Sequence, residues 1–139
     1  MPEDADIVFI EDNANDIELM KHALLKAGSQ DSLAILTDGE QATAYLSERI
    51  SKGSLPSLII TDLKLPRKDG HELVEWMRRQ SGLAQIPIVV LTSSDEKQDI
   101  DRAISLGANA FIQKPLGLSD LVKIVQSLLA SWVRRKALK

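Results

Sequence analysis

Side chains that could handle a metal ion and a phosphoryl group follow the apolar runs of this chain. Three of them are carboxylates, and carboxylates gathered at one place repel one another unless a cation joins them. Ligands that are all oxygen atoms favour a hard cation, and Mg²⁺ takes one or two carboxylates together with a substrate phosphate. The set comprises Glu11, Asp12, Asp62, Thr92, Ser93 and Lys114.

The other members of the set suit a phosphoryl group. Lys114 can pair with its charge, and the hydroxyl of Thr92 can donate a hydrogen bond to it. An aspartate carboxylate can act as a nucleophile and form an aspartyl-phosphate. The chemistry indicated is therefore phosphoryl transfer onto a carboxylate, in which the metal neutralises developing charge.

Each of these residues, taken alone, also has an ordinary structural explanation. An aspartate after a strand is most often a turn residue or a helix cap. Glu11 and Asp12 could cap the first helix. Thr92 could begin a turn, and Lys114 could be a solvated loop residue. Their joint occurrence at successive strand ends favours the functional interpretation.

The elements that must position these residues can be recognised from periodicity. Longer amphipathic segments, such as the one in which Ile17, Met20 and Leu24 step by three or four, separate short apolar runs. Continuously apolar strands indicate burial on both faces, and therefore a parallel sheet covered by helices. We expect an α/β fold of five βα units, a doubly wound, flavodoxin-like sheet in three layers (α/β/α). The expected strands are 7–10, 33–36, 58–60, 86–91 and 110–112.

This fold predicts where the polar residues meet. In open parallel sheets, sites form beyond the carboxyl ends of the strands, near the point where the strand order reverses. Asp69 with Glu72, and Ser93 with Glu96, match the capping-box pattern that begins a helix. Glycine accepts the left-handed conformation that ends many helices. We expect helices to end near Gly28, Gly53, Gly82 and Gly107.

Composition narrows the class of protein. The chain has 139 residues, which suits one domain, and its net charge of -3 provides no basic field for nucleic acid. It contains no cysteine, which excludes disulfides and thiol chemistry, and two histidines, too few for a histidine-rich zinc site. The apolar runs are shorter than the about 18 residues that indicate a membrane span, and the first residues lack a signal-peptide pattern. A cytoplasmic protein without membrane contact is expected.

Taken together, these residues resemble the receiver domain of bacterial two-component response regulators, which are chemotaxis-regulator-like (CheY-like) proteins. The resemblance extends over residues 6–133, and we expect one receiver domain over 1–139 with no effector domain. It rests on Glu11-Asp12, Asp62 with Leu63-Lys64-Leu65-Pro66 and Asp69-Gly70, Leu91-Thr92-Ser93, and Lys114-Pro115.

The resemblance implies a role for each matching position around the metal. Asp62 would be the phosphoacceptor. Glu11 and Asp12 would form the acidic pair that binds Mg²⁺ together with Asp62. Lys64 would offer its backbone carbonyl to the same ion. Glu11 stands where many relatives have aspartate, a longer arm that the family tolerates.

Further positions would form the switch. Thr92, with Ser93 beside it, would contact the phosphoryl group, and Lys114 would pair with it. Phe111 matches the aromatic residue that turns inward when the threonine moves, and the alternative is that it is a core residue of the sheet. Lys64 and Ser94, each two positions past a key residue, occupy places linked to the rate of dephosphorylation.

The resemblance also implies partners. The segments EDNANDIELM, DGEQATAYL and DLKLPRKDG, with the late Trp132, are similar to single-domain regulators that serve phytochrome-type sensor kinases. A sensor histidine kinase or a histidine phosphotransfer protein would then supply the phosphoryl group. The signal would leave by protein–protein contact.

The last helix predicts a further contact. Its apolar residues spread over roughly 180°, wider than the about 100° stripe that packs a surface helix against its own domain. We expect a homodimer through this helix, unless the domain itself buries the helix more deeply. The basic residues Arg134, Arg135, Lys136 and Lys139 suit a helix terminus better than a nucleic-acid patch. The expected interface comprises Leu121, Ile124, Leu128 and Trp132.

Three other functions compete with a phosphorylatable switch. A phosphatase of the haloacid dehalogenase type needs a second aspartate two residues past the nucleophile, where this chain has Lys64. An FMN carrier of the flavodoxin type needs a phosphate loop rich in serine, threonine and glycine after the first strand, where this chain has acidic residues. A docking module that is never phosphorylated would not need Asp62 and Lys114. We therefore expect a switch protein rather than an enzyme.

Overall fold

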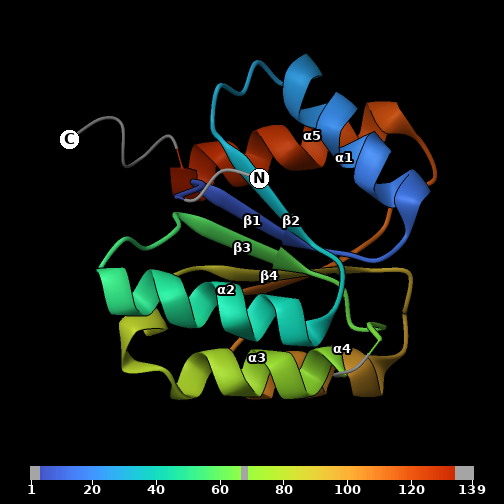
Figure 1. The fold of residues 1–139 in the computed structure, drawn as a ribbon. Helices are drawn as coiled ribbons and strands as arrows, with labels where there is room; N and C mark the ends of the chain where they lie inside the picture. The colour runs from blue at the N-terminus through green and yellow to red at the C-terminus, as the bar shows by residue number, and fades with distance from the viewer. Residues whose placement is uncertain (1–3, 67–68, 134–139) are drawn as a thin grey trace.

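The sheet has the parallel architecture that the apolar runs predict. The computed structural model describes residues 4–66 and 69–133. Its five strands are all parallel and lie in the order β2-β1-β3-β4-β5. Figure 1 labels the first four of them. The strands are β1 (Ile7–Ile10), β2 (Leu33–Leu36), β3 (Leu58–Thr61), β4 (Ile88–Thr92) and β5 (Ala110–Gln113).

Helices cover both faces of this sheet, as Figure 1 shows. Ile7 and Phe9 point into the core beneath α1 and α5, whereas Val8 and Ile10 point into the core beneath α2, α3 and α4. This alternation explains why the strands are apolar at every position. The helices are α1 (Ala14–Lys26), α2 (Gly39–Lys52), α3 (Gly70–Arg79), α4 (Lys97–Ser105) and α5 (Leu118–Leu128).

The register of the strands brings their carboxyl ends to one level. Ile10 at the end of β1 pairs with Thr61 at the end of β3, although the two strands are not consecutive in sequence. The next residue continues the ladder, because the Asp62 N–H donates to the Ile10 carbonyl at 3.1 Å. On the other side, the Lys114 N–H donates to the Thr92 carbonyl at 2.7 Å. The strand order reverses between β1 and β3, and the polar residues that follow the strands emerge at this edge of the sheet.

The start of α4 differs from the predicted capping box at Ser93. The N-cap is Glu96, and α4 begins at Lys97. Ser94 organises this turn instead, because its hydroxyl accepts from the Glu96 N–H at 3.3 Å and donates to Asp99 Oδ2 at 2.5 Å. The prediction at Asp69 is confirmed as an N-cap, since its Oδ1 accepts from the His71 N–H.

The structure confirms three of the four glycine predictions. Gly28, Gly53 and Gly107 take positive φ values just past α1, α2 and α4. Gly82 does not, because α3 ends at Arg79 and Gly82 lies within the 3-10 turn Ser81–Leu83 that follows. Its Cβ position would contact the side chain of Ile50 on α2, so this glycine serves close packing.

The domain itself buries part of the α5 face that we expected to form a dimer interface. Leu121 and Leu128 are 6% and 5% exposed and belong to the core beneath α1 and α5, so they are not available to a partner. Ile124 and Trp132 are half-buried at the edge of that core. The helix continues as a π-helical turn, Leu129–Val133. The basic residues after it, Arg134 to Lys136 and Lys139, lie outside the described residues.

Among residues 4–66 and 69–133, no helix combines the length and the apolar character needed to cross a bilayer.

Candidate functional site

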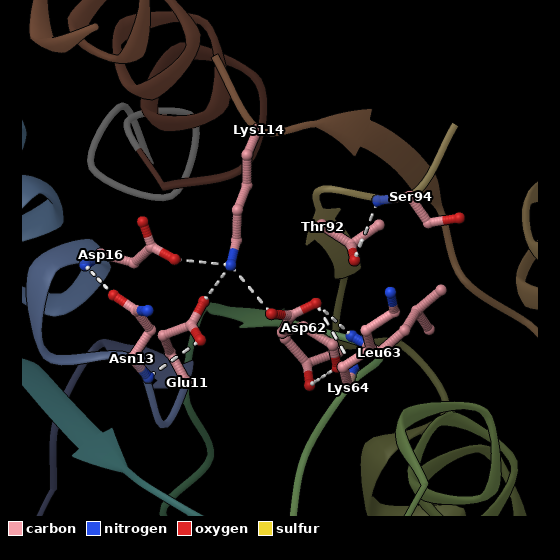
Figure 2. Close-up of polar contacts among 10 residues, drawn as sticks. Glu11, Asn13, Asp16, Asp62, Leu63, Lys64, Thr92, Ser94 and Lys114 are labelled. Atoms are coloured by element: carbon pink, nitrogen blue, oxygen red, sulfur yellow. Dashed lines mark hydrogen bonds and ion pairs between the residues drawn. The ribbon is translucent and has the colours of Figure 1, made fainter. Parts of the chain in front are cut away.

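A lysine ammonium group stands at the centre of the carboxyl edge of the sheet. Lys114 Nζ lies 2.8 Å from Asp62 Oδ2, 2.7 Å from Glu11 Oε1 and 2.7 Å from Asp16 Oδ2 (Figure 2). The Glu11 and Asp62 side chains are only 1% and 7% exposed. Three carboxylates therefore meet one ammonium group in a largely buried place.

The sheet topology explains this convergence. Glu11 and Asp62 follow adjacent strands, β1 and β3, so their backbones leave the sheet side by side. Lys114 follows the edge strand β5, and its long side chain reaches toward β3 past the end of β4 (Figure 2). Thr92 ends β4 between them, and its side chain is fully buried.

The turn after β3 holds the Asp62 carboxylate in one orientation. Its Oδ1 accepts from the Leu63 N–H at 2.6 Å and, more weakly, from the Lys64 N–H at 3.4 Å. Its Oδ2 accepts from Lys114 Nζ. Gly70 at the start of α3 closes the turn, because its N–H donates to the Leu63 carbonyl at 2.8 Å. Both oxygens are thus fixed by groups from different parts of the chain.

Gly70 is the position at which a single methyl group should disturb this turn. A Cβ there would lie 2.3 Å from Leu63 Cα and 2.6 Å from the Asp62 carbonyl oxygen, and neither backbone atom can yield cheaply. Gly70→Ala is expected to lower the free energy of unfolding by about 1–3 kcal/mol. Urea unfolding measures this change.

Gly117→Ala is the matched control, because nothing lies within 4 Å of its Cβ position. We expect it to change the free energy of unfolding by less than about 1 kcal/mol. Equal stability of Gly70→Ala and the wild type would show that the turn can move, contrary to the packing described.

The charges around Asp62 favour its ionised form. Burial by itself raises the pKa of Asp62, but the Lys114 ammonium, the Thr92 hydroxyl and the Leu63 N–H outweigh it, so the pKa lies below its ordinary value. Burial lowers the pKa of Lys114, but the carboxylates of Asp16, Asp62 and Glu11 raise it by more. Asp62 is consequently a carboxylate, and Lys114 an ammonium group, at neutral pH.

Glu11 behaves in the opposite way. Its burial raises the pKa, and the negative charge of Asp62 adds to that rise, while Lys114 offsets only part of it. Glu11 Oε1 is buried and accepts no hydrogen bond from the described part of the chain, so its contact with Lys114 is an ion pair without hydrogen-bond alignment. This oxygen has capacity for a further cationic partner.

The remaining predicted ligands lie at the rim. Asp12, Lys64 and Ser93 are exposed, and they line an open cavity of about 670 Å³ together with Glu11 and Asp62. Within residues 4–66 and 69–133, no three acidic or histidine side chains converge closely enough to form a ready-made metal cluster. Lys114 stands between Glu11 and Asp62 instead.

The residues nevertheless fit a divalent cation. The donors around the cavity are oxygen atoms, which hard cations prefer. The carboxylates outnumber the ammonium group, and Glu11 Oε1 lacks a hydrogen bond. A cation at the cavity would balance charge that Lys114 leaves uncompensated.

Sequence reasoning missed Asp16. This residue lies in the first turn of α1, where acidic residues usually serve the helix dipole, and that ordinary explanation concealed it. The available signal was its spacing, since it follows the acidic pair by one helical turn.

Sequence reasoning also missed a connection between the loop after β4 and α3. The Ser94 N–H approaches Thr92 Oγ1 at 3.5 Å, and the Ser94 hydroxyl bonds Asp99 on α4. His71, which is 5% exposed, places its Nε2 3.2 Å from the Asp99 carbonyl oxygen. Phe111 is half-buried against the core beneath α3 and α4. No local pattern distinguishes His71 or Asp99.

Comparison with known proteins agrees with this geometry. The family model described as "Response regulator receiver domain" matches residues 7–126. The chain is 36% identical to the probable methanogenesis regulatory protein FilR2 of Methanothrix harundinacea, over 91% of this chain and 83% of that protein. It is 34% identical to the response regulator Rcp1 of a Synechocystis species, over 91% of this chain and 88% of that protein.

Solved structures give the same result. The phosphorylated cyanobacterial phytochrome response regulator RcpA superposes with a TM-score of 0.84 at 35% identity, covering 93% of this chain and 94% of that one. The Mn²⁺-bound form of Rcp1 gives a TM-score of 0.78 at 33% identity, covering 91% and 92%. These similarities agree with a receiver domain, and not with a dehalogenase-type phosphatase or an FMN carrier.

Proposed function

Because this chain belongs to the family of response regulator receiver domains, which are phosphoacceptor signalling proteins rather than enzymes that turn over a substrate, we propose that it accepts its phosphoryl group on Asp62. The observation that carries this proposal is the doubly held carboxylate, buried at the end of β3 and bonded by backbone N–H groups on one side and Lys114 on the other. Phosphorylation of the wild type but not of Asp62→Asn, followed by intact mass, tests it.

The geometry suggests a role for each residue in phosphoryl transfer. A carboxylate oxygen of Asp62 forms the bond to phosphorus while the P–N bond of a phosphohistidine donor breaks, and the imidazole leaves. Because Asp62 is ionised, no base is needed to activate it. Lys114 pairs with the charge of the transferred group. The preformed turn keeps the carboxylate oriented, so little reorganisation accompanies transfer.

We propose Mg²⁺ as the cation of this site. Glu11, Asp12, Asp62 and the backbone carbonyl of Lys64 would hold it. When bound, it supplies a positive charge that neutralises the phosphoryl oxygens during transfer. The support is the set of oxygen donors around the cavity, together with the Mn²⁺ that the similar regulator Rcp1 binds.

We propose that Thr92, Ser93 and Phe111 carry the response. Thr92 is buried beside Asp62 and would move toward the phosphoryl group, and Phe111 has room to change burial because it is only half-buried. Lys64 is exposed at the rim and is the better placed of the two proposed rate-tuning residues. The hydroxyl of Ser94 is engaged with Asp99, so its influence on the rate would pass through α4.

We propose a sensor histidine kinase, of the phytochrome type, or a histidine phosphotransfer protein as the phosphodonor. The support is the similarity to RcpA, which is a phytochrome response regulator. The signal would leave by protein–protein contact.

We also propose a homodimer through the half-buried edge of α5 and of the π-helical turn after it, with an interface that includes Ile124 and Trp132 but not the buried Leu121 and Leu128. Ile124→Glu is expected to shift sedimentation from dimer to monomer at high micromolar concentration, because it places a charge in an apolar contact. Ile104→Glu on α4 is the control, since that side chain is 46% exposed on another helix. Circular dichroism verifies the fold of both variants. A wild type that remains monomeric, with and without beryllofluoride, would contradict the dimer.

A further inference from the structure

We propose that Asp16 is a positioning residue for phosphorylation: its carboxylate holds the Lys114 ammonium group and competes for it with the phosphoryl group. The inference rests on the proposed role of Asp62 as phosphoacceptor. It concerns a residue of α1 that lies within the segment EDNANDIELM but to which the resemblance assigns no role.

The contacts of Lys114 carry this inference. Its ammonium group donates one hydrogen bond to Asp16 Oδ2 at 2.7 Å and another to Asp62 Oδ2 at 2.8 Å. Its contact with Glu11 is an ion pair only. In Figure 2, the Asp16 and Asp62 carboxylates lie on opposite sides of Nζ. The ammonium group is therefore shared among three carboxylates, and Asp16 is the one that lies opposite the phosphoacceptor.

The backbone of Asp16 is anchored at the start of α1, which keeps its carboxylate in place to compete with Asp62 for Lys114. Its backbone N–H donates to Asn13 Oδ1 at 2.9 Å, which anchors the first turn of α1. Asn13 in turn donates its N–H to Glu11 Oε2 at 3.2 Å. The Asp16 side chain is 31% exposed, whereas those of Glu11 and Asp62 are 1% and 7% exposed, so water reaches Asp16 more readily than the two buried carboxylates.

Phosphorylation changes the balance between the two acceptors. A phosphoryl group on Asp62 adds negative charge on one side of Lys114, while Asp16 continues to attract the ammonium group from the other side. The charge of Asp16 also opposes the arrival of any anion at Asp62. Removing that charge should leave Lys114 free to pair with the phosphoryl group, and should strengthen anion binding at Asp62.

Beryllofluoride, an anion that mimics the phosphoryl group, gives an equilibrium test at saturating Mg²⁺. Asp16→Asn is expected to bind it about three- to tenfold more tightly than the wild type, as measured by calorimetric titration. Asp16→Glu, which keeps the charge, is expected to return toward the wild-type affinity. Glu18→Gln removes a charge from the same helix, at an exposed residue paired with Lys21, and should change affinity less than about twofold.

A double-mutant cycle separates positioning from simple repulsion. In the protein without ligand, Asp16→Asn and Lys114→Met should change the unfolding equilibrium constant non-additively, by about fivefold or more, because the two side chains contact each other. If Lys114→Met does not fold, Lys114→Gln takes its place in the cycle.

The outcomes are distinct. Additive effects in the cycle, or an Asp16→Asn affinity equal to that of Glu18→Gln, would overturn the role of Asp16. A wild type that binds no beryllofluoride, or an Asp62→Asn variant that binds it as well as the wild type, would instead overturn the proposed phosphoacceptor.

Discussion

Asp62→Asn is expected to abolish phosphorylation completely. Incubation with acetyl phosphate and Mg²⁺ should add the mass of one phosphoryl group to the wild type and none to the variant. The amide is not a nucleophile, yet it can still accept the Leu63 N–H bond that orients the side chain. The substitution also removes one of the three negative charges that meet at Lys114 and repel one another. We therefore expect the variant to remain folded.

Asp120→Asn is the matched control, since Asp120 is an exposed acid in the first turn of α5. It should gain the phosphoryl group as the wild type does. Phosphorylation of Asp62→Asn to the same extent would place the acceptor elsewhere. A wild type that gains no mass would favour the alternative in which the domain only docks to partners.

Lys114→Met is expected to lower the free energy of unfolding by about 3–5 kcal/mol in the absence of divalent cations. The substitution leaves the buried carboxylates of Glu11 and Asp62 without the ammonium group that lies between them. A domain of this kind has about 5–15 kcal/mol of stability, so the variant should fold but unfold early in urea. Urea unfolding with EDTA gives the measurement.

Two comparisons test the physical reason for this expected loss of stability. Mg²⁺ should stabilise Lys114→Met more than the wild type, because the cation replaces a missing positive charge. Lys97→Met, which breaks an exposed pair with Asp101, should cost less than about 1 kcal/mol. A Lys114→Met variant as stable as Lys97→Met would mean that water, rather than Lys114, compensates the buried carboxylates.

Local patterns were sufficient for the elements of the fold. Each predicted strand is found, with ends shifted by at most two residues at β4, because continuous apolar runs have few other structures open to them. The cap at Asp69 could be predicted because it depends on residues within one turn. The cap expected at Ser93 was wrong, since Asp99 engages Ser94 in a contact that the capping pattern does not contain.

The burial of α5 could not be predicted from local sequence patterns. Its wide apolar face suggested a partner, but α1 and the sheet cover Leu121 and Leu128 within the same domain. Periodicity reports how much of a helix is apolar and not what covers it.

The sequence by itself determined the acidic pair after β1, the aspartate after β3 and the lysine after β5, because each directly follows an apolar run. Their assigned roles in phosphorylation stay predictions. Only the tertiary structure decided that β1 lies beside β3, that Lys114 spans from β5 to the carboxylates, and that Asp16 joins them. The physical reason is range: caps and strands follow from neighbours in sequence, whereas Lys114 and Asp16 are 98 residues apart and meet only when the sheet and α1 are packed.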